Sequence, residues 1–120
     1  MEILEFRKKD TYILGLHGKL DAASSPHFRD KFFGLIDEGE THFLIDCSQL
    51  EYVSSAGLRV FFEAAYKIED LSGRMVFCSL SSNVKKVFDM VELSSELPVY
   101  PSQEVAFKEM EEERAASTDE

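Results

Sequence analysis

The sequence predicts an α/β fold in which helices connect the strands of a largely parallel sheet. Two short, unbroken apolar runs, 42–47 and 74–80, are typical of strands buried on both faces of a sheet. A segment with a helical spacing of apolar residues follows each run. Two further β-rich runs, 2–7 and 11–17, open the chain and are separated by a short polar turn, which predicts an antiparallel hairpin.

The first helix is predicted to begin at Ser25 and to end at Gly39. Ser25 is the expected N-cap, Pro26 suits the first helical position, and a glycine commonly follows the last helical turn. The apolar residues of this segment recur with a helical spacing and predict its buried face: Phe28, Phe32, Leu35 and Ile36.

The second helix is predicted from Ser55 to Leu71, with Gly73 ending it. One side of this segment is apolar, at Leu58, Phe61, Phe62, Ala65 and Ile68. The other side carries a charged residue at every fourth position, at Arg59, Glu63 and Lys67. This amphipathic pattern is the strongest helical signal in the chain.

The last third of the chain predicts three more elements. A third helix is expected over 81–91, behind serines that could cap it. The segment 97–101 is bracketed by prolines, which favours a brief edge strand. A final helix is expected over 102–113, fraying into the polar segment 114–120. The residues therefore predict five strands and four helices.

The charge of the chain argues against a phosphate-rich partner. Its 120 residues carry 13 basic and 23 acidic side chains, a formal net charge of -10. Affinity for nucleic acid comes mainly from Lys and Arg that neutralise phosphates, so we expect neither nucleic acid nor an anionic membrane as a partner. The last twelve residues hold six of the acidic side chains, so the remainder is only mildly acidic.

We expect a cytoplasmic protein with reduced thiols. No basic-then-apolar leader opens the sequence, and no window of eighteen apolar residues occurs. Cys47 and Cys78 lie in apolar runs, where a thiol behaves as a small hydrophobic group. Two buried free cysteines are therefore expected rather than a disulfide.

The pair Ser54 and Ser55, just before the second helix, does not fit a known catalytic pattern. A serine hydrolase needs G-x-S-x-G, and the sequence Tyr-Val-Ser-Ser-Ala-Gly lacks the first glycine. The three histidines and two cysteines show no metal-ligand spacing, and no glycine-rich phosphate loop is present. We therefore predict a protein that is not an enzyme and that holds no metal or cofactor.

Two interpretations of the serine pair remain. In the first, Ser54 or Ser55 is simply an N-cap, whose replacement by alanine costs about 0.5–2 kcal/mol. In the second, a phosphoryl group on Ser55 adds about -1.5 to -2 charges at the positive end of the helix. Asp21 and Asp46, if they lie nearby, would be repelled by this group. Gly57 would then let a partner approach without meeting a Cβ.

Three stretches of the chain resemble a known family: GKLDAASSPHF, FLIDCSQLEYVSSAGLRVFFEA and RMVFCSLSSNVKKVFDMVEL. Together they resemble the STAS domain, the module of sulphate transporters and anti-sigma-factor antagonists, over about residues 3–110. The central motif is Asp-x-Ser, a spacer, then Ser-Ser-x-Gly-Leu. It stands here as Asp46, Ser48 and the run from Ser54 to Leu58.

The resemblance implies a four- or five-stranded, mixed and mostly parallel sheet with about four helices mainly on one face. It places the STAS domain at 1–111, followed by an acidic and flexible tail over 112–120. It is strongest for the small free-standing antagonists, in which an anti-sigma factor with serine kinase activity phosphorylates one serine. The unphosphorylated antagonist captures that kinase and releases the sigma factor, and a serine phosphatase reverses the modification.

Carried over by motif, the acceptor is Ser55, with Ser54 as the second candidate. The partner-binding residues implied by the motif are Asp21, Asp46, Ser54, Ser55, Gly57 and Leu58. Many antagonists have an acid directly before the acceptor, whereas this chain has Ser54 there. The alternative is a scaffold or transport-accessory STAS subunit that is never phosphorylated.

Overall fold

A computed structural model describes residues 1–93 and 97–118 of the chain. The strands are β1 (Glu2–Lys8), β2 (Thr11–Leu20), β3 (His42–Asp46), β4 (Leu50–Val53), β5 (Arg74–Cys78) and β6 (Val99–Tyr100). The helices are α1 (Ser25–Asp37), α2 (Ser55–Asp70), α3 (Ser82–Met90) and α5 (Gln103–Thr118). The predicted alternation of strands and helices is confirmed.

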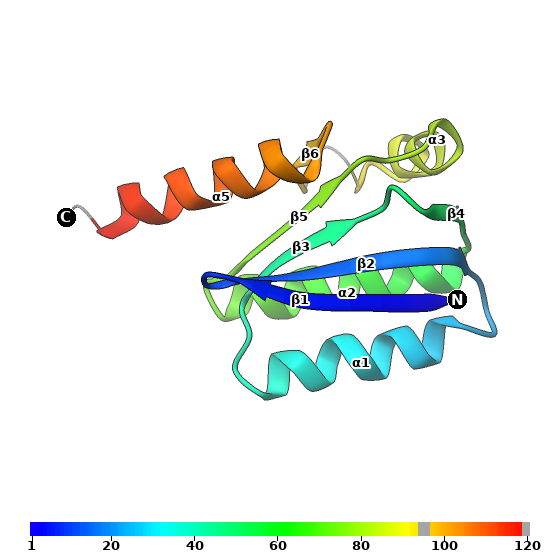
Figure 1. Cartoon of the computed structure of the whole chain (residues 1–120). Helices are drawn as coiled ribbons and strands as arrows, with labels where there is room; N and C mark the ends of the chain where they lie inside the picture. The colour runs from blue at the N-terminus through cyan, green and yellow to red at the C-terminus, as the bar shows by residue number, and fades with distance from the viewer. Residues whose placement is uncertain (94–96, 119–120) are drawn as a thin grey trace.

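The strands form one sheet in the order β1-β2-β3-β5-β6 (Figure 1). β1 and β2 are antiparallel, as the predicted opening hairpin requires, whereas β2, β3, β5 and β6 run parallel to one another. β4 was not predicted. It pairs with the carboxyl end of β2, where Leu20 lies opposite Val53. The described residues thus contain six strands, one more than the predicted upper number.

In the view of Figure 1, α1 and α2 lie below the sheet and α5 lies above it. α1, α2 and α3 bury their apolar sides in the larger of two clusters. α5 covers the opposite face through a smaller cluster: Ile13, Leu44, Val76, Cys78, Ala106 and Met110. The expectation of helices mainly on one face is therefore confirmed.

Phenylalanine rings join the elements of the larger cluster. The ring of Phe61 in α2 lies 5.6 Å from that of Phe28 in α1, 5.0 Å from Phe77 in β5 and 5.9 Å from Phe88 in α3. All three pairs are edge to face, the arrangement that the charge distribution of the rings favours. These rings are fully buried, so this cluster fixes α2 against the sheet.

Two helix ends differ from the prediction in their cap or by several residues, and the others lie within two residues of it. The N-cap of α1 is Ser24, so Ser25 is already helical. α5 continues to Thr118, through the segment where a tail was predicted to begin at residue 112. Arg114 supports this extra length, because its guanidinium reaches Glu111 at 2.9 Å and Asp10 at 3.4 Å.

Cys47 and Cys78 are buried free thiols, as predicted. Burial raises the pKa of both thiols, that of Cys78 to about 11, so neither is an activated nucleophile. Within the two described ranges, no helix has both the length and the apolar character needed to span a bilayer.

Candidate functional site

The short strand β4 positions the amino end of α2. Leu20 and Val53 pair in register, and the backbone N–H of Ser54 donates to the carbonyl oxygen of Leu20 at 2.8 Å. Ser54 is extended, with φ -90° and ψ 173°, and its hydroxyl oxygen accepts the backbone N–H of Gly57 at 3.2 Å. Ser54 is therefore the N-cap and is half-buried in that role.

Ser55 is the first residue of α2 and its side chain is exposed. Among the described residues its hydroxyl forms no hydrogen bond. It lies at the helix end where backbone N–H groups without intrahelical partners and the positive end of the helix dipole accumulate. The two serines thus have separate roles, because Ser54 holds the helix end and Ser55 presents its hydroxyl to solvent.

Gly57 is buried, which contradicts the expectation that a partner approaches it. A Cβ built on this residue would lie 2.7 Å from Leu20 Cγ and 3.0 Å from Val53 Cγ2. The missing side chain therefore serves the packing of α2 on the sheet. Leu58 is also largely buried, with 8% of its surface exposed, and belongs to the main core.

Asp21 directly follows β2, in a loop next to the start of α2. The hydrogen bond between Leu20 and Ser54 links the two segments. The Asp21 carboxylate accepts the backbone N–H groups of Ser24 at 3.0 Å and Ala23 at 3.1 Å, and the Ser24 hydroxyl at 3.1 Å. These hydrogen bonds, the one from the Ser24 backbone first, hold the pKa of Asp21 below its ordinary value. A fixed negative charge therefore lies beside the serine pair.

Asp46 forms its described hydrogen bonds with the loop after β3 and with α5. Its carboxylate accepts the backbone N–H of Ser48 at 2.9 Å and the side-chain amide of Gln103 in α5 at 3.1 Å. Side chains alternate along β3, so Asp46 shares the face of Leu44, which packs under α5. These contacts engage Asp46 on the α5 side of the sheet, and the expectation that it flanks Ser55 stays a prediction.

The surface around Ser55 also includes an apolar groove that the sequence did not reveal. The groove has a volume of about 450 Å³ and lies between α2 and the end of α3. It is lined by Ser55, Leu58, Arg59, Phe62, Glu63, Tyr66 and Val91. Tyr66 is 62% exposed there, and Met90, next to Val91, is 82% exposed. The sequence contained one indication of this surface, because Ser55, Arg59 and Glu63 recur every fourth residue and therefore share one side of α2.

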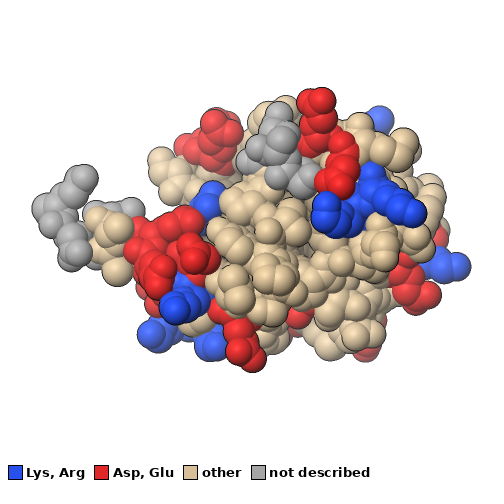
Figure 2. Space-filling model, turned by 90° about the horizontal axis from the view of Figure 1, so that it is seen from above, with Lys and Arg blue, Asp and Glu red and all other residues tan. Residues whose placement is uncertain are grey.

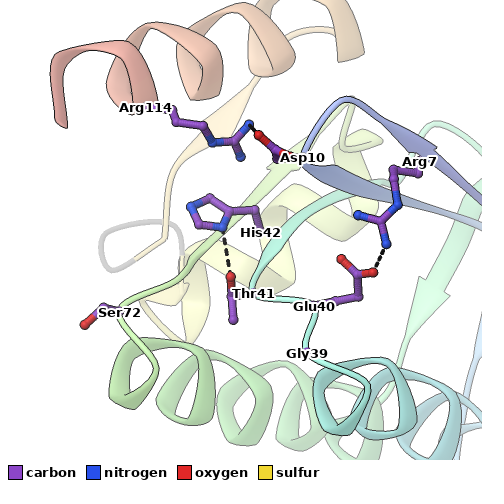
Figure 3. Close-up of a pocket in the computed structure, with 8 residues that line it drawn as sticks. All are labelled: Arg7, Asp10, Gly39, Glu40, Thr41, His42, Ser72 and Arg114. Atoms are coloured by element: carbon purple, nitrogen blue, oxygen red, sulfur yellow. Dashed lines mark hydrogen bonds and ion pairs between the residues drawn. The ribbon is translucent and has the colours of Figure 1, made fainter. Parts of the chain in front are cut away.

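A second cavity, of about 550 Å³, lies at the opposite end of the sheet (Figure 3). Arg7 pairs with Glu40 there, and Arg114 points toward Asp10. Burial is the main cause that lowers the pKa of His42, and the positive charge of Arg114 lowers it further. The neutral ring is therefore favoured at pH 7. Because acidic neighbours offset both arginines, this cavity does not select an anion.

Sequence comparison identifies the family of the chain. A model of the STAS domain matches residues 5–106. The chain belongs to the STAS domain family.

Curated STAS relatives are named for the regulation of sigma factors. The chain is 33% identical over 91 residues to BtrV of Bordetella bronchiseptica, which is assigned as an anti-sigma factor antagonist, covering 76% of this chain and 78% of BtrV. It is 27% identical over 100 residues to an anti-sigma F factor antagonist of Paenibacillus polymyxa, covering 82% and 86%.

Solved STAS structures have the same fold. The unphosphorylated anti-sigma factor antagonist SpoIIAA matches with a TM-score of 0.81 at 21% identity, over 92% of this chain and 96% of that one. SpoIIAA of Bacillus in its phosphorylated form matches with a TM-score of 0.74 at 21% identity, over 91% and 99%. The predicted fold class is thereby confirmed.

Proposed function

We propose that this STAS domain is an anti-sigma-factor antagonist whose binding to an anti-sigma serine kinase is switched by phosphorylation of Ser55. The observation that carries the proposal is the division of roles at the start of α2. Ser54 caps the helix through its hydroxyl, whereas the Ser55 hydroxyl is exposed and forms no hydrogen bond among the described residues. A kinase can therefore modify Ser55 without removing the cap.

The proposed switch acts through charge on a surface that keeps its shape. A phosphoryl group adds about -1.5 to -2 charges at pH 7. The helix end accommodates this charge locally, because backbone N–H groups and the dipole favour an anion there. The ionised carboxylate of Asp21 is held in the neighbouring loop. Phosphorylation then raises the negative potential of a site that already carries one acid, and this repels an acidic contact on the partner.

The groove beside Ser55 is the proposed binding site for apolar side chains of the kinase. Tyr66 and Val91 are exposed in it although both are large apolar groups. Arg59 borders the groove one turn after Ser55. A partner that docks over this groove would also contact the Ser55 hydroxyl. A single phosphate on Ser55 would therefore obstruct the whole interface.

In this proposal the chain performs no chemistry of its own and works in the cytoplasm with two enzymes. The kinase adds the phosphate to Ser55, and a serine phosphatase removes it. The relative SpoIIAA has been solved in both an unphosphorylated and a phosphorylated form. This supports a modification cycle for the present chain, on the same fold.

Phosphate mapping tests the proposal directly. The chain and its Ser54→Ala and Ser55→Ala variants are incubated with ATP and the serine kinase encoded beside its gene or captured with it, and the peptides are sequenced by mass spectrometry. We expect Ser55→Ala to abolish incorporation and Ser54→Ala to retain it. Incorporation at Ser54 alone would reassign the acceptor. No incorporation into any of the three proteins would instead favour a constitutive scaffold or transport-accessory role.

A further inference from the structure

The outer edge of β1 has no partner among the described residues. β1 is the terminal strand of the sheet and pairs only with β2. All seven of its residues, from Glu2 opposite His17 to Lys8 opposite Thr11, lie in uninterrupted register, so no bulge twists the edge away. β1 also contains no proline. Its outward N–H and C=O groups are thus arranged as a template for another strand.

The face of β1 on the α5 side is apolar and open. Leu4 and Phe6 point to this face, because they lie opposite Gly15 and Ile13, and Ile13 packs beneath α5. α5 itself lies over β3, β5 and β6, so Leu4 and Phe6 remain 46% and 49% exposed. Figure 2 looks onto the α5 side and shows uncharged surface in its middle, with charged groups gathered toward its margins.

The sequence of β1 is complementary to itself when it is read in the opposite direction. An antiparallel copy centred on Glu5 places Glu2 opposite Lys8 and Leu4 opposite Phe6, each pair twice. All these side chains lie on the α5 side of β1, since side chains alternate along a strand, and the Lys8 ammonium lies 4.3 Å from the ring centre of Phe107 in α5. Opposite charges and apolar pairs that face each other across two strands stabilise a sheet.

Neighbouring registers lack this complementarity. A pairing centred on Leu4 sets Glu2 against Phe6, and one centred on Phe6 sets Leu4 against Lys8. Both would place a charge against an apolar group on the open face. Only the pairing centred on Glu5 matches both the charges and the apolar residues.

The opposite face accepts the same pairing. The two Glu5 side chains would lie opposite each other on this face, and like charges in that position destabilise a sheet when they have no other partner. Each Glu5, however, is bound by Lys31 from α1 and accepts the Tyr12 hydroxyl at 2.6 Å. Arg7 would lie opposite Ile3, where its apolar stem can cover the isoleucine.

We propose that β1 is a homodimerisation edge, on which a second copy of this chain pairs antiparallel about a two-fold axis at Glu5 and joins the two sheets. The interface is built from two Glu2–Lys8 ion pairs, two Leu4–Phe6 contacts and the main-chain ladder between the strands. Ser55 lies outside it, so the dimer does not depend on the phosphorylation switch.

Charge reversal tests the register. Glu2→Lys places lysine opposite Lys8 twice, and Lys8→Glu places glutamate opposite Glu2 twice. We expect each variant to dimerise roughly tenfold more weakly than the parent in sedimentation-velocity runs over a range of concentrations. Mixing the two variants in equal amounts restores the dimer, because every ion pair is complementary between unlike copies. Glu51→Lys and Lys86→Glu, which make the same charge changes outside β1, leave dimerisation unchanged.

A cross-link tests the two-fold axis. Glu5→Cys brings two thiols to the axis, whereas Arg7→Cys, on the same face of β1, places each thiol opposite Ile3. We expect a short bismaleimide to cross-link the Glu5→Cys chains in pairs and to leave the Arg7→Cys chains without a cross-link, with the buried native thiols unreactive. A parent chain that sediments as a monomer at every concentration, or a mixture of the reversed variants that stays monomeric, overturns the proposal.

Discussion

Gly57 in the first turn of α2 lies so close to Leu20 at the end of β2 that a Cβ on the glycine would stand 2.7 Å from Leu20 Cγ. Ser54, three residues earlier, is tied to the carbonyl oxygen of the same leucine at 2.8 Å. The helix that presents Ser55 is thus seated on the sheet by one close packing contact and one backbone hydrogen bond. This seating explains why a residue that disfavours helices occupies the first turn.

Gly57→Ala should destabilise the fold although alanine is the better helix former. The added methyl group has no space against Leu20 and Val53, and overpacking of this kind costs about 1–3 kcal/mol. We expect the free energy of unfolding, measured by urea titration, to fall by that amount. Gly34→Ala is the matched control, because Gly34 lies in α1 and a methyl group added to it would meet no atom within 4 Å. It should gain up to about 1 kcal/mol. Equal effects of the two changes would contradict the packing explanation.

The two serines should respond differently to alanine. Ser54→Ala removes the acceptor for the Gly57 N–H, so we expect a loss of about 1 kcal/mol in the free energy of unfolding. Ser55→Ala removes an exposed hydroxyl and should change stability by less than about 0.5 kcal/mol. Thermal and urea unfolding of both variants check this order. A larger loss for Ser55→Ala would show that Ser55 has a capping role.

The Asp21 loop should contribute stability that depends on pH. The folded protein holds the pKa of Asp21 below its unfolded value, so the ionised carboxylate stabilises the fold above about pH 4. This contribution is lost as the pH falls through the folded pKa. The difference in unfolding free energy between the parent and Asp21→Ala should therefore shrink on acidification from pH 7 to below pH 3. A difference that stays constant over this interval would argue against the hydrogen bonds to the carboxylate.

Tyr66 should matter for partner binding and little for folding. Its side chain is 62% exposed in the groove beside Ser55, so Tyr66→Ser should leave the unfolding free energy within about 0.5 kcal/mol of the parent. We expect the same change to weaken binding of the cognate kinase at least tenfold in surface plasmon resonance. Val105→Ser, at a 41% exposed apolar position on α5, is the control and should bind as the parent does. Unchanged binding by Tyr66→Ser would remove the groove from the proposed interface.

Apolar periodicity was sufficient to predict most of the fold. Phe61 and Phe88 fall on the apolar stripes of their helices, and both lie in the main core. β4 escaped prediction because it has only four residues, two of them exposed, and its pairing with the end of β2 is a long-range property. The length of α5 was underestimated because Arg114 gains its partner Asp10 only in the folded chain.

Two features of the site depend on contacts between distant segments and could not be predicted from the sequence. Sequence alone left either Ser54 or Ser55 as the N-cap, since serine suits that position. The extended backbone of Ser54 decides between them, and it follows from the pairing of β4 with β2. The groove was missed because Val91 belongs to a separate segment that meets α2 only in three dimensions.

The affinity of the cognate anti-sigma kinase for the unmodified and the Ser55-phosphorylated chain, measured by isothermal titration, tests the central claim most directly. We predict that the phosphorylated chain and Ser55→Asp bind at least tenfold more weakly than the unmodified chain, and that Ser55→Ala binds as the unmodified chain does. Equal affinities of all four proteins would contradict the switch and leave Ser55 as an ordinary surface residue of a constitutive binding domain.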